Sequence, residues 1–165
     1  MTEINDRDIT LDRMRYVKNT ASSRLCYLAI LLNVLYFVSI YKSDVGSWYY
    51  QLLIGGSIVY NLLFMLMAFL ASEGVKSYQK SYSWLLYGLG IFQIIRIFIL
   101  PTQAHQALVQ VGGKETQVMG DGQYIRVIIY LAASAACLIG AALINQRKCS
   151  MLEGHLKSLE AKGAV

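Results

Sequence analysis

Residues 62–71 read LLFMLMAFLA, ten consecutive positions without a polar side chain. A strand of a membrane barrel alternates apolar and polar residues over about ten positions, and this stretch shows no alternation. The apolar run to which it belongs extends from residue 51 to residue 71. Since a helix needs roughly 17–25 mostly apolar residues to cross the hydrocarbon core, the run 51–71 predicts a membrane-spanning helix.

Three more runs of the same kind flank it, at residues 25–41, 84–100 and 127–145. The whole chain is 56% hydrophobic and only 15% charged, whereas a soluble domain carries about 25% charged residues. We therefore expect an all-α integral membrane protein in which residues 25–145 form an antiparallel bundle of four transmembrane helices. Residues 1–24 and 146–165 are then expected to be tails.

Lysine and arginine are distributed unevenly between the two sides of such a bundle. The two tails and the connection after the second helix hold eleven of them, the other two connections hold three, and Arg96 lies within the third helix. Because positively charged connections remain on the cytoplasmic side, we expect both termini to be cytoplasmic and the protein to lie in the cytoplasmic membrane. The net charge of +5 follows from this bias, so the lipid bilayer is an expected partner and nucleic acid is not.

The connection at residues 101–126 is the only sizeable segment expected on the outer side. Pro101 is expected to end the third helix, because an internal proline removes a hydrogen bond from a helix. Three short stretches then read as strand, turn and strand: ALVQV (107–111), GGKE (112–115) and TQVMG (116–120). We expect a small β-hairpin here, with Val109 and Val111 facing Val118.

Both tails carry helical patterns. Apolar residues recur with helical spacing in the N-terminal tail, at Leu11, Met14, Val17 and Ala21. This segment is either an amphipathic helix on the membrane surface or a helical extension of the first span. In the C-terminal tail, Leu152, Leu156 and Leu159 share one helix face, which predicts a short amphipathic cytoplasmic helix.

Each of the four expected spans carries a polar residue that reaches towards the membrane midplane. These residues are Asn33, Asn61, Gln93 and Ser134. They are interpreted either as an internal hydrogen-bonded network that fixes the helix register, or as a polar path through the bundle. Against a path, no span contains Asp or Glu, on which proton-coupled transport commonly depends.

Arg96 follows Gln93 by three residues, on the same helix face. Three interpretations are open: the side chain reaches the outer headgroups, pairs with a carboxylate, or binds an anion. A side chain that only reached the surface would need no polar neighbour below it. We therefore expect Arg96 to face the protein interior and to pair with a carboxylate. Asp121 is the favoured partner, and Glu115 and Asp44 are the others.

Small residues recur on two of the spans, at positions where another helix can approach closely. They are spaced by four in the last span, at Ala132, Ala136 and Gly140, and adjacent in the second span, at Gly55 and Gly56. One four-helix bundle does not need small faces as broad as these. Their extent favours association with other chains.

The sequence contains no motif for catalysis or metal binding. It has no H-E-x-x-H, G-x-S-x-G or C-x-x-C pattern, and its two histidines are expected on opposite sides of the membrane. We expect no enzyme, metal site or cofactor, but a small membrane subunit that packs against larger partners, for example in a transporter complex. A hetero-complex is favoured over a homo-oligomer. The alternative is a small homo-oligomeric transporter or channel that uses the polar face of Arg96 and Gln93.

Overall fold

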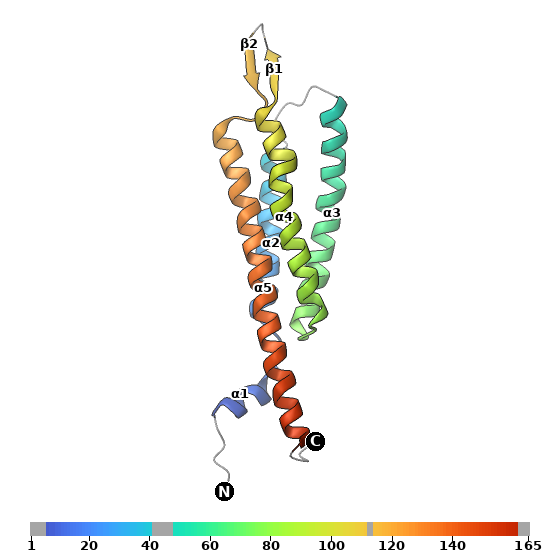
Figure 1. Ribbon diagram of the computed structural model, residues 1–165, viewed down its shortest axis with the longest axis vertical. Helices are drawn as coiled ribbons and strands as arrows, with labels where there is room; N and C mark the ends of the chain where they lie inside the picture. Colours follow the sequence, from blue (N-terminus) through green and yellow to red (C-terminus); the bar gives the residue numbers. More distant parts are fainter. Residues whose placement is uncertain (1–5, 41–47, 112–113, 162–165) are drawn as a thin grey trace.

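Four mostly apolar runs form the four long helices of the fold (Figure 1). The structure is a computed structural model that describes residues 6–40, 48–111 and 114–161. Its elements in chain order are α1 (Asp6–Met14), α2 (Thr20–Ile40), α3 (Trp48–Lys76), α4 (Ser81–Gln106), β1 (Leu108–Val111), β2 (Lys114–Gln117) and α5 (Asp121–Ala161). Four helices are long and apolar enough to cross a membrane, namely α2, α3 from Gly55 onwards, α4 and α5. This confirms the prediction of four such helices in an all-α fold.

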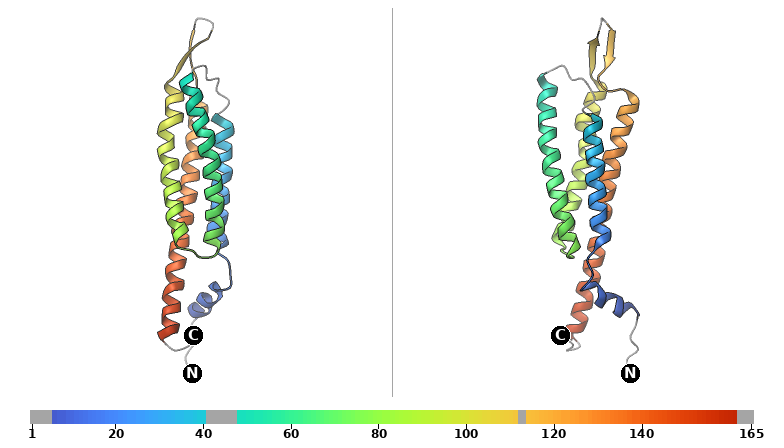
Figure 2. Two further views of the ribbon diagram at one scale, coloured as in Figure 1. Left: turned by 90° about the vertical axis from the view of Figure 1, so that its right-hand side faces the viewer. Right: turned by 180° about the vertical axis from the view of Figure 1, so that it is seen from behind.

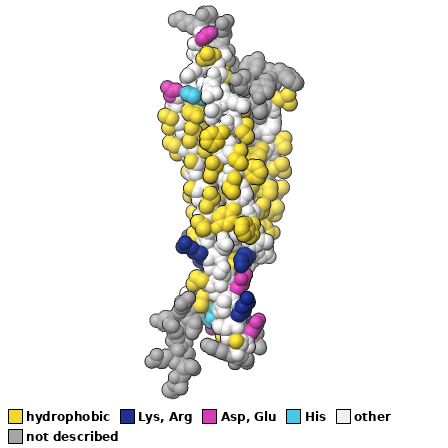
Figure 3. All heavy atoms as spheres, in the orientation of Figure 1, with side chains coloured by type: hydrophobic (Ala, Val, Ile, Leu, Met, Phe, Trp, Pro, Cys, Tyr) yellow, Lys and Arg dark blue, Asp and Glu magenta, His cyan; other side chains and the backbone are white. Residues whose placement is uncertain are grey.

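The two ends of the bundle differ in charge. Lysine and arginine side chains gather beyond one end of the apolar surface (Figure 3). We refer to this end, formed by the start of α2, the α3–α4 turn and the part of α5 after Asn145, as the basic end. The opposite end carries β1 and β2, and we refer to it as the strand end.

Two apolar clusters hold the helices together. All four long helices contribute to the cluster nearer the basic end, which includes Cys26, Ala29, Phe64, Ala68, Leu86, Leu89 and Leu138. The cluster nearer the strand end consists of Tyr36, Ile40, Leu100, Ala104, Met119, Val127 and Leu131. These side chains come from α2, α4, α5 and the segment before α5, and no described residue of α3 is among them. Figures 1 and 2 accordingly show the strand-end half of α3 standing apart from the other helices.

Pro101 does not end α4, which continues to Gln106, so this prediction is wrong. Proline at position 101 has no N–H to donate to the carbonyl of Ile97, four residues earlier. The hydroxyl of Thr102 donates to that carbonyl instead, at 2.9 Å. Because the carbonyl is satisfied, the helix runs through the proline without leaving an unpaired acceptor.

The strands β1 and β2 pair antiparallel at the strand end. Their register includes the pairs Val109 with Thr116 and Val111 with Lys114. Only two residues separate the strands, the shortest of the common connections between antiparallel strands, so β2 begins earlier than expected. The predicted facing of Val109 and Val111 with Val118 is therefore wrong. The Val118 N–H donates to the carbonyl of Ala107 at 3.0 Å.

The last helix is much longer than its membrane span. α5 runs for 41 residues to Ala161 without a break, and no proline interrupts this stretch. The amphipathic segment expected as a separate C-terminal helix is thus the end of α5. It is joined to the α3–α4 turn by an ion pair between Lys80 Nζ and Glu153 Oε2 at 3.3 Å.

The N-terminal helix α1 lies beside this end of α5 (Figure 1). Because α1 ends at Met14 and α2 begins at Thr20, α1 is not a helical extension of the first span. Leu11 is buried, and Asp12 Oδ1 lies 2.8 Å from His155 Nε2 of α5. The two ends of the described chain are therefore held together.

Candidate functional site

A layer of polar side chains crosses the bundle between the two apolar clusters. Asn33, Asn61, Gln93 and Ser134 come from the four long helices, and none is more than 1% exposed. Asn33 Nδ2 donates to Asn61 Oδ1 at 3.0 Å, and Gln93 Nε2 donates to Asn33 Oδ1 at 3.1 Å and to Ser134 Oγ at 3.4 Å. The structure thus brings together the four polar residues that the sequence singled out.

This polar layer lies between the two apolar clusters along the bundle axis. Asn61 and Gln93 lie within about one residue of the middle of α3 and α4, so the layer is near mid-depth in the bundle. Apolar side chains of one cluster lie between it and the basic end, and those of the other lie between it and the strand end. Among the described residues, these hydrogen bonds run across the bundle and link its four long helices.

Arg96 joins this layer and is only 7% exposed. Its Nη1 donates to Asn33 Oδ1 at 3.2 Å and to Asn61 Oδ1 at 2.9 Å, and its Nη2 donates to Ser57 Oγ at 2.8 Å. Its Cζ also lies 4.3 Å and 4.7 Å from the ring centroids of two tyrosines, Tyr36 and Tyr60. The guanidinium therefore points across the bundle and not towards the membrane surface.

Because α4 continues past Pro101, Arg96 lies far from the end of this helix. It lies ten residues before Gln106, the last residue of the helix, which corresponds to about 15 Å along the axis. This is too far for the side chain to reach the end of the bundle. The amide oxygens of Asn33 and Asn61 face it instead, so that the negative ends of two amide dipoles lie next to the cation.

The three candidate carboxylates are placed as follows. Asp121 begins α5, its side chain is 82% exposed, and its Oδ1 lies 3.7 Å from Nε2 of His105. Glu115 is exposed on β2, and Asp44 lies outside the described residues. The favoured partner is thus next to a histidine at the strand end rather than in the polar layer.

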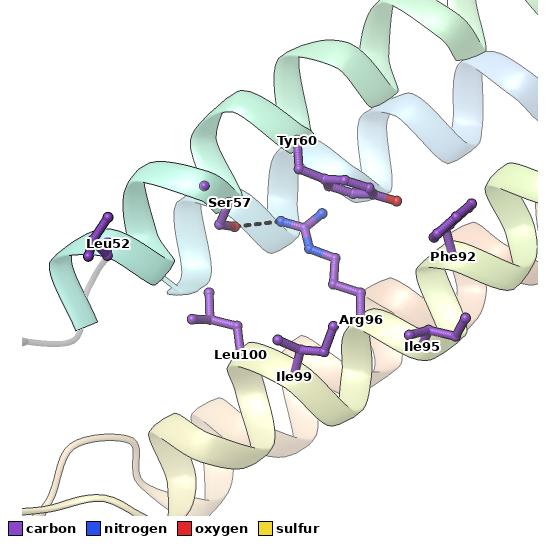
Figure 4. A pocket seen from close by; sticks show the side chains of 9 residues that line it. Leu52, Ser57, Tyr60, Phe92, Ile95, Arg96, Ile99 and Leu100 are labelled. Atoms are coloured by element: carbon purple, nitrogen blue, oxygen red, sulfur yellow. Dashed lines mark hydrogen bonds between the residues drawn. The ribbon is translucent and has the colours of Figure 1, made fainter. Parts of the chain in front are cut away.

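A groove opens from the polar layer between α3 and α4 (Figure 4). It has a volume of about 380 Å³, within the usual range of about 300–1,000 Å³ for ligand pockets. Its lining residues are Leu52, Gly56, Ser57 and Tyr60 from α3, and Phe92, Ile95, Arg96, Ile99 and Leu100 from α4. Arg96 and Ser57 meet across the floor of this groove, which is otherwise almost entirely apolar.

Two buried oxygen atoms at the polar layer have no hydrogen-bond partner among the described residues. They are Oε1 of Gln93 and the hydroxyl of Tyr60. Tyr60 also lines the groove, and Figure 4 shows its hydroxyl reaching towards Phe92 of α4. A buried hydroxyl is normally paired, so the Tyr60 hydroxyl is a donor that a bound molecule could use.

The small residues assigned to helix packing are mostly turned away from the bundle. Ala132 and Ala136 are exposed on α5. A side chain added at Gly55 or Gly56 would meet no atom within 4 Å, whereas one at Gly140 would lie 3.8 Å from Leu25 of α2. Of the five residues, the described contacts therefore place only Gly140 against another helix of the same chain.

Sequence reasoning missed Ser57, Tyr36 and Tyr60 around the guanidinium. The signal for Ser57 was its spacing of four from Asn61, which puts both on one face of α3. It also missed a second polar cluster at the basic end, centred on Asn145.

This cluster ties three elements together. Asn145 Nδ2 donates to Ser83 Oγ at 2.9 Å and to the carbonyl of Gln79 at 3.1 Å. Its Oδ1 accepts from Asn19 Nδ2 at 3.1 Å. Asn145 is fully buried and so fixes α5 against the start of α2 and the start of α4.

No protein-family model, curated protein or solved structure matches this chain. The function proposed for it therefore rests on its own residues and geometry.

Proposed function

We propose that the chain is a small, non-enzymatic subunit of a membrane complex that packs against larger membrane proteins, for example those of a transporter. The observation that carries this proposal is the form of α5. One continuous helix offers a small-residue face within the bundle and an extension of sixteen residues beyond it. A partner can therefore contact the same element at two levels.

The membrane face of α5 is suited to another helix. Ala132 and Ala136 are exposed and lie four residues apart, and small side chains at this spacing let helix backbones approach closely. Beyond Asn145, α5 continues for sixteen residues, or about 24 Å. The ion pair with Lys80 and the contact with α1 hold this extension in place.

The same proposal includes an orientation. Eleven of the fifteen lysines and arginines belong to the tails and the α3–α4 connection, and three belong to the other connections. This distribution favours the basic end, with both termini, on the cytoplasmic side of the cytoplasmic membrane. The extension of α5 is then available to cytoplasmic parts of a partner. A channel through one copy of the chain receives less support, because apolar clusters lie on both sides of the polar layer.

The test is to extract the protein from native membranes in a mild detergent and to measure complex size on native gels, with mass spectrometry of the bands. Ala132→Leu and Ala136→Leu should each shift the chain towards its isolated size, because a bulky side chain holds a partner helix away. Both positions are exposed, so the isolated chain should keep its thermal stability.

The matched control is Ala21→Leu, the same change at an exposed position of α2, which should leave the complex intact. Gly140→Leu and Ala142→Leu are unsuitable as further variants of α5, because Gly140 faces Leu25 and Ala142 is buried, so both changes would disturb the bundle itself. If the wild-type chain migrates alone, or if both α5 variants leave the complex unchanged, the subunit proposal is wrong.

A further inference from the structure

We propose that the groove between α3 and α4 binds a single-chain amphiphile from the bilayer, a long-chain carboxylic acid, whose carboxyl group meets Arg96 and Ser57. The apolar chain would lie along the wall of the groove. This site is independent of the α5 surface on which the subunit proposal rests.

The walls of the groove favour an apolar occupant. Its apolar lining comes from both helices, at Leu52, Phe92, Ile95, Ile99 and Leu100. Ligand sites in proteins commonly combine such a wall with a few convergent polar groups and lie between helices of a bundle. In a membrane, this groove is bathed in hydrocarbon chains, so its polar floor is what would select one ligand over another.

The floor of the groove favours an acceptor with negative charge. Arg96 brings a permanent cation, and a cation attracts an anion far more strongly in a medium of low dielectric constant than in water. The Ser57 hydroxyl accepts from Arg96 and has a proton of its own to donate. The Tyr60 hydroxyl has no hydrogen-bond partner among the described residues. Arg96 and Ser57 thus offer donors side by side on the floor of the groove, and the unpaired Tyr60 hydroxyl lies on the other side of the guanidinium, towards Phe92 (Figure 4).

The depth of the site favours a carboxylic acid over a phospholipid headgroup. Arg96 lies about 15 Å from the end of α4 along the helix axis, and its side chain is only 7% exposed. A phosphate headgroup keeps its charge and is costly to bring to this depth. A carboxylic acid can enter the hydrocarbon in its uncharged form. A single chain also needs no second groove, which a two-chain lipid would.

A glycine makes the site testable without touching its polar groups. Gly56 lines the groove, and a side chain added there meets no atom within 4 Å. Gly56→Phe should therefore fill the groove while the helices stay in place. Gly55 has the same open surroundings but does not line the groove, so Gly55→Phe is the matched control.

The experiment measures thermal unfolding of the purified, delipidated protein in an uncharged detergent, with oleic acid and methyl oleate as probes. Oleic acid should raise the melting temperature in a saturable manner, since a ligand that binds only the folded state stabilises it. Methyl oleate, which has the same chain without the acid, should raise it much less. Gly56→Phe should abolish the oleic acid effect, Gly55→Phe should keep it, and Arg96→Leu should weaken the apparent affinity at least about tenfold, or 1.4 kcal/mol.

Three results would overturn the proposal. Equal stabilisation by oleic acid and methyl oleate would show a groove that accepts any hydrocarbon chain. Equal stabilisation of wild type and Gly56→Phe would place binding elsewhere. Absence of stabilisation, combined with a smaller native complex in Gly56→Phe, would show that a partner helix occupies the groove. That last result would leave the subunit proposal standing, because complex size and ligand-induced stabilisation are separate measurements.

Discussion

Arg96 is a cation that is almost fully buried in the bundle, and polar side chains surround it. Asn33 and Asn61 present their amide oxygens to the guanidinium, and Asn61 Nδ2 turns back to the carbonyl of Ser57 at 2.8 Å. Hydrogen bonds between membrane helices contribute about 0.6 kcal/mol on average, and those to charged groups are stronger. The main effect of Arg96 is therefore to tie α3 to α4 at a level where apolar packing does not.

At this scale, the partner of Arg96 can be tested by double-mutant cycles. Arg96→Leu and Ser57→Ala should each lower the free energy of unfolding in mixed micelles, and together they should cost about 1 kcal/mol less than their sum, since they remove one shared hydrogen bond. The control cycle pairs Arg96→Leu with Asp121→Asn. Those two changes should be additive within about 0.5 kcal/mol, because the Asp121 carboxylate lies against His105. Coupling to Asp121 and not to Ser57 would contradict the described geometry.

Among the elements, α3 and α4 differ in how they are held. The basic-end half of α3 packs through Phe64 and Ala68 into a cluster shared by all four helices. Among its described residues, the other half is tied to α4 and α2 mainly through polar contacts of Ser57 and Asn61. α4 is packed along both halves and runs straight through Pro101.

The continuity of α4 depends on one hydroxyl. Thr102→Val keeps the shape of the side chain but leaves the Ile97 carbonyl without its donor, so it should destabilise the protein by about 1–3 kcal/mol. In a Pro101→Ala background the backbone N–H at position 101 can satisfy that carbonyl, and the cost of Thr102→Val should largely disappear. Unfolding measured by circular dichroism in detergent checks both. Equal costs in the two backgrounds would mean that the Thr102 hydroxyl acts elsewhere, for example through Tyr124, which lies 3.5 Å away.

The membrane spans could be predicted from the sequence because continuous apolar runs have no other stable form in a bilayer. The ends of the helices could not. α4 passes Pro101, where the neighbouring Thr102 hydroxyl satisfies the Ile97 carbonyl, and α5 passes Asn145, which is buried in contact with Asn19 and Ser83. Both effects depend on neighbours that hydropathy does not weigh.

On the scale of the whole molecule, orientation is the property most open to direct measurement. In a cysteine-free variant, a single cysteine at Thr116 should react with a membrane-impermeant maleimide on intact cells, and single cysteines at Ser77 or Ser158 should react only after the cells are opened. All three positions are exposed, so accessibility depends on the side of the membrane alone. The opposite labelling pattern would reverse the orientation inferred from the lysines and arginines.

Arg96 and the four polar residues of the candidate site could be predicted from the sequence, but their pairing and the three further residues around the guanidinium could not. Four polar residues at similar depth had to face inward, because lipid does not satisfy them. Which oxygen Arg96 would meet depended on how α3 is rotated about its own axis, and a list of spans does not contain that angle. The contacts of Ser57 and Tyr60 follow from that rotation, whereas Tyr36 comes from α2.

The length of α5 on both sides of Asn145 has a mechanical consequence. Its 41 residues form a helix about 60 Å long. Asn145 is hydrogen-bonded to residues at the start of α2 and of α4. A tilt of about 5° there moves the tip, about 24 Å away, by about 2 Å, a displacement of the size that switching interfaces use. Because α5 is one continuous helix that contacts α2 and α4 within the bundle and α1 beyond it, a change in its tilt would move its two parts together.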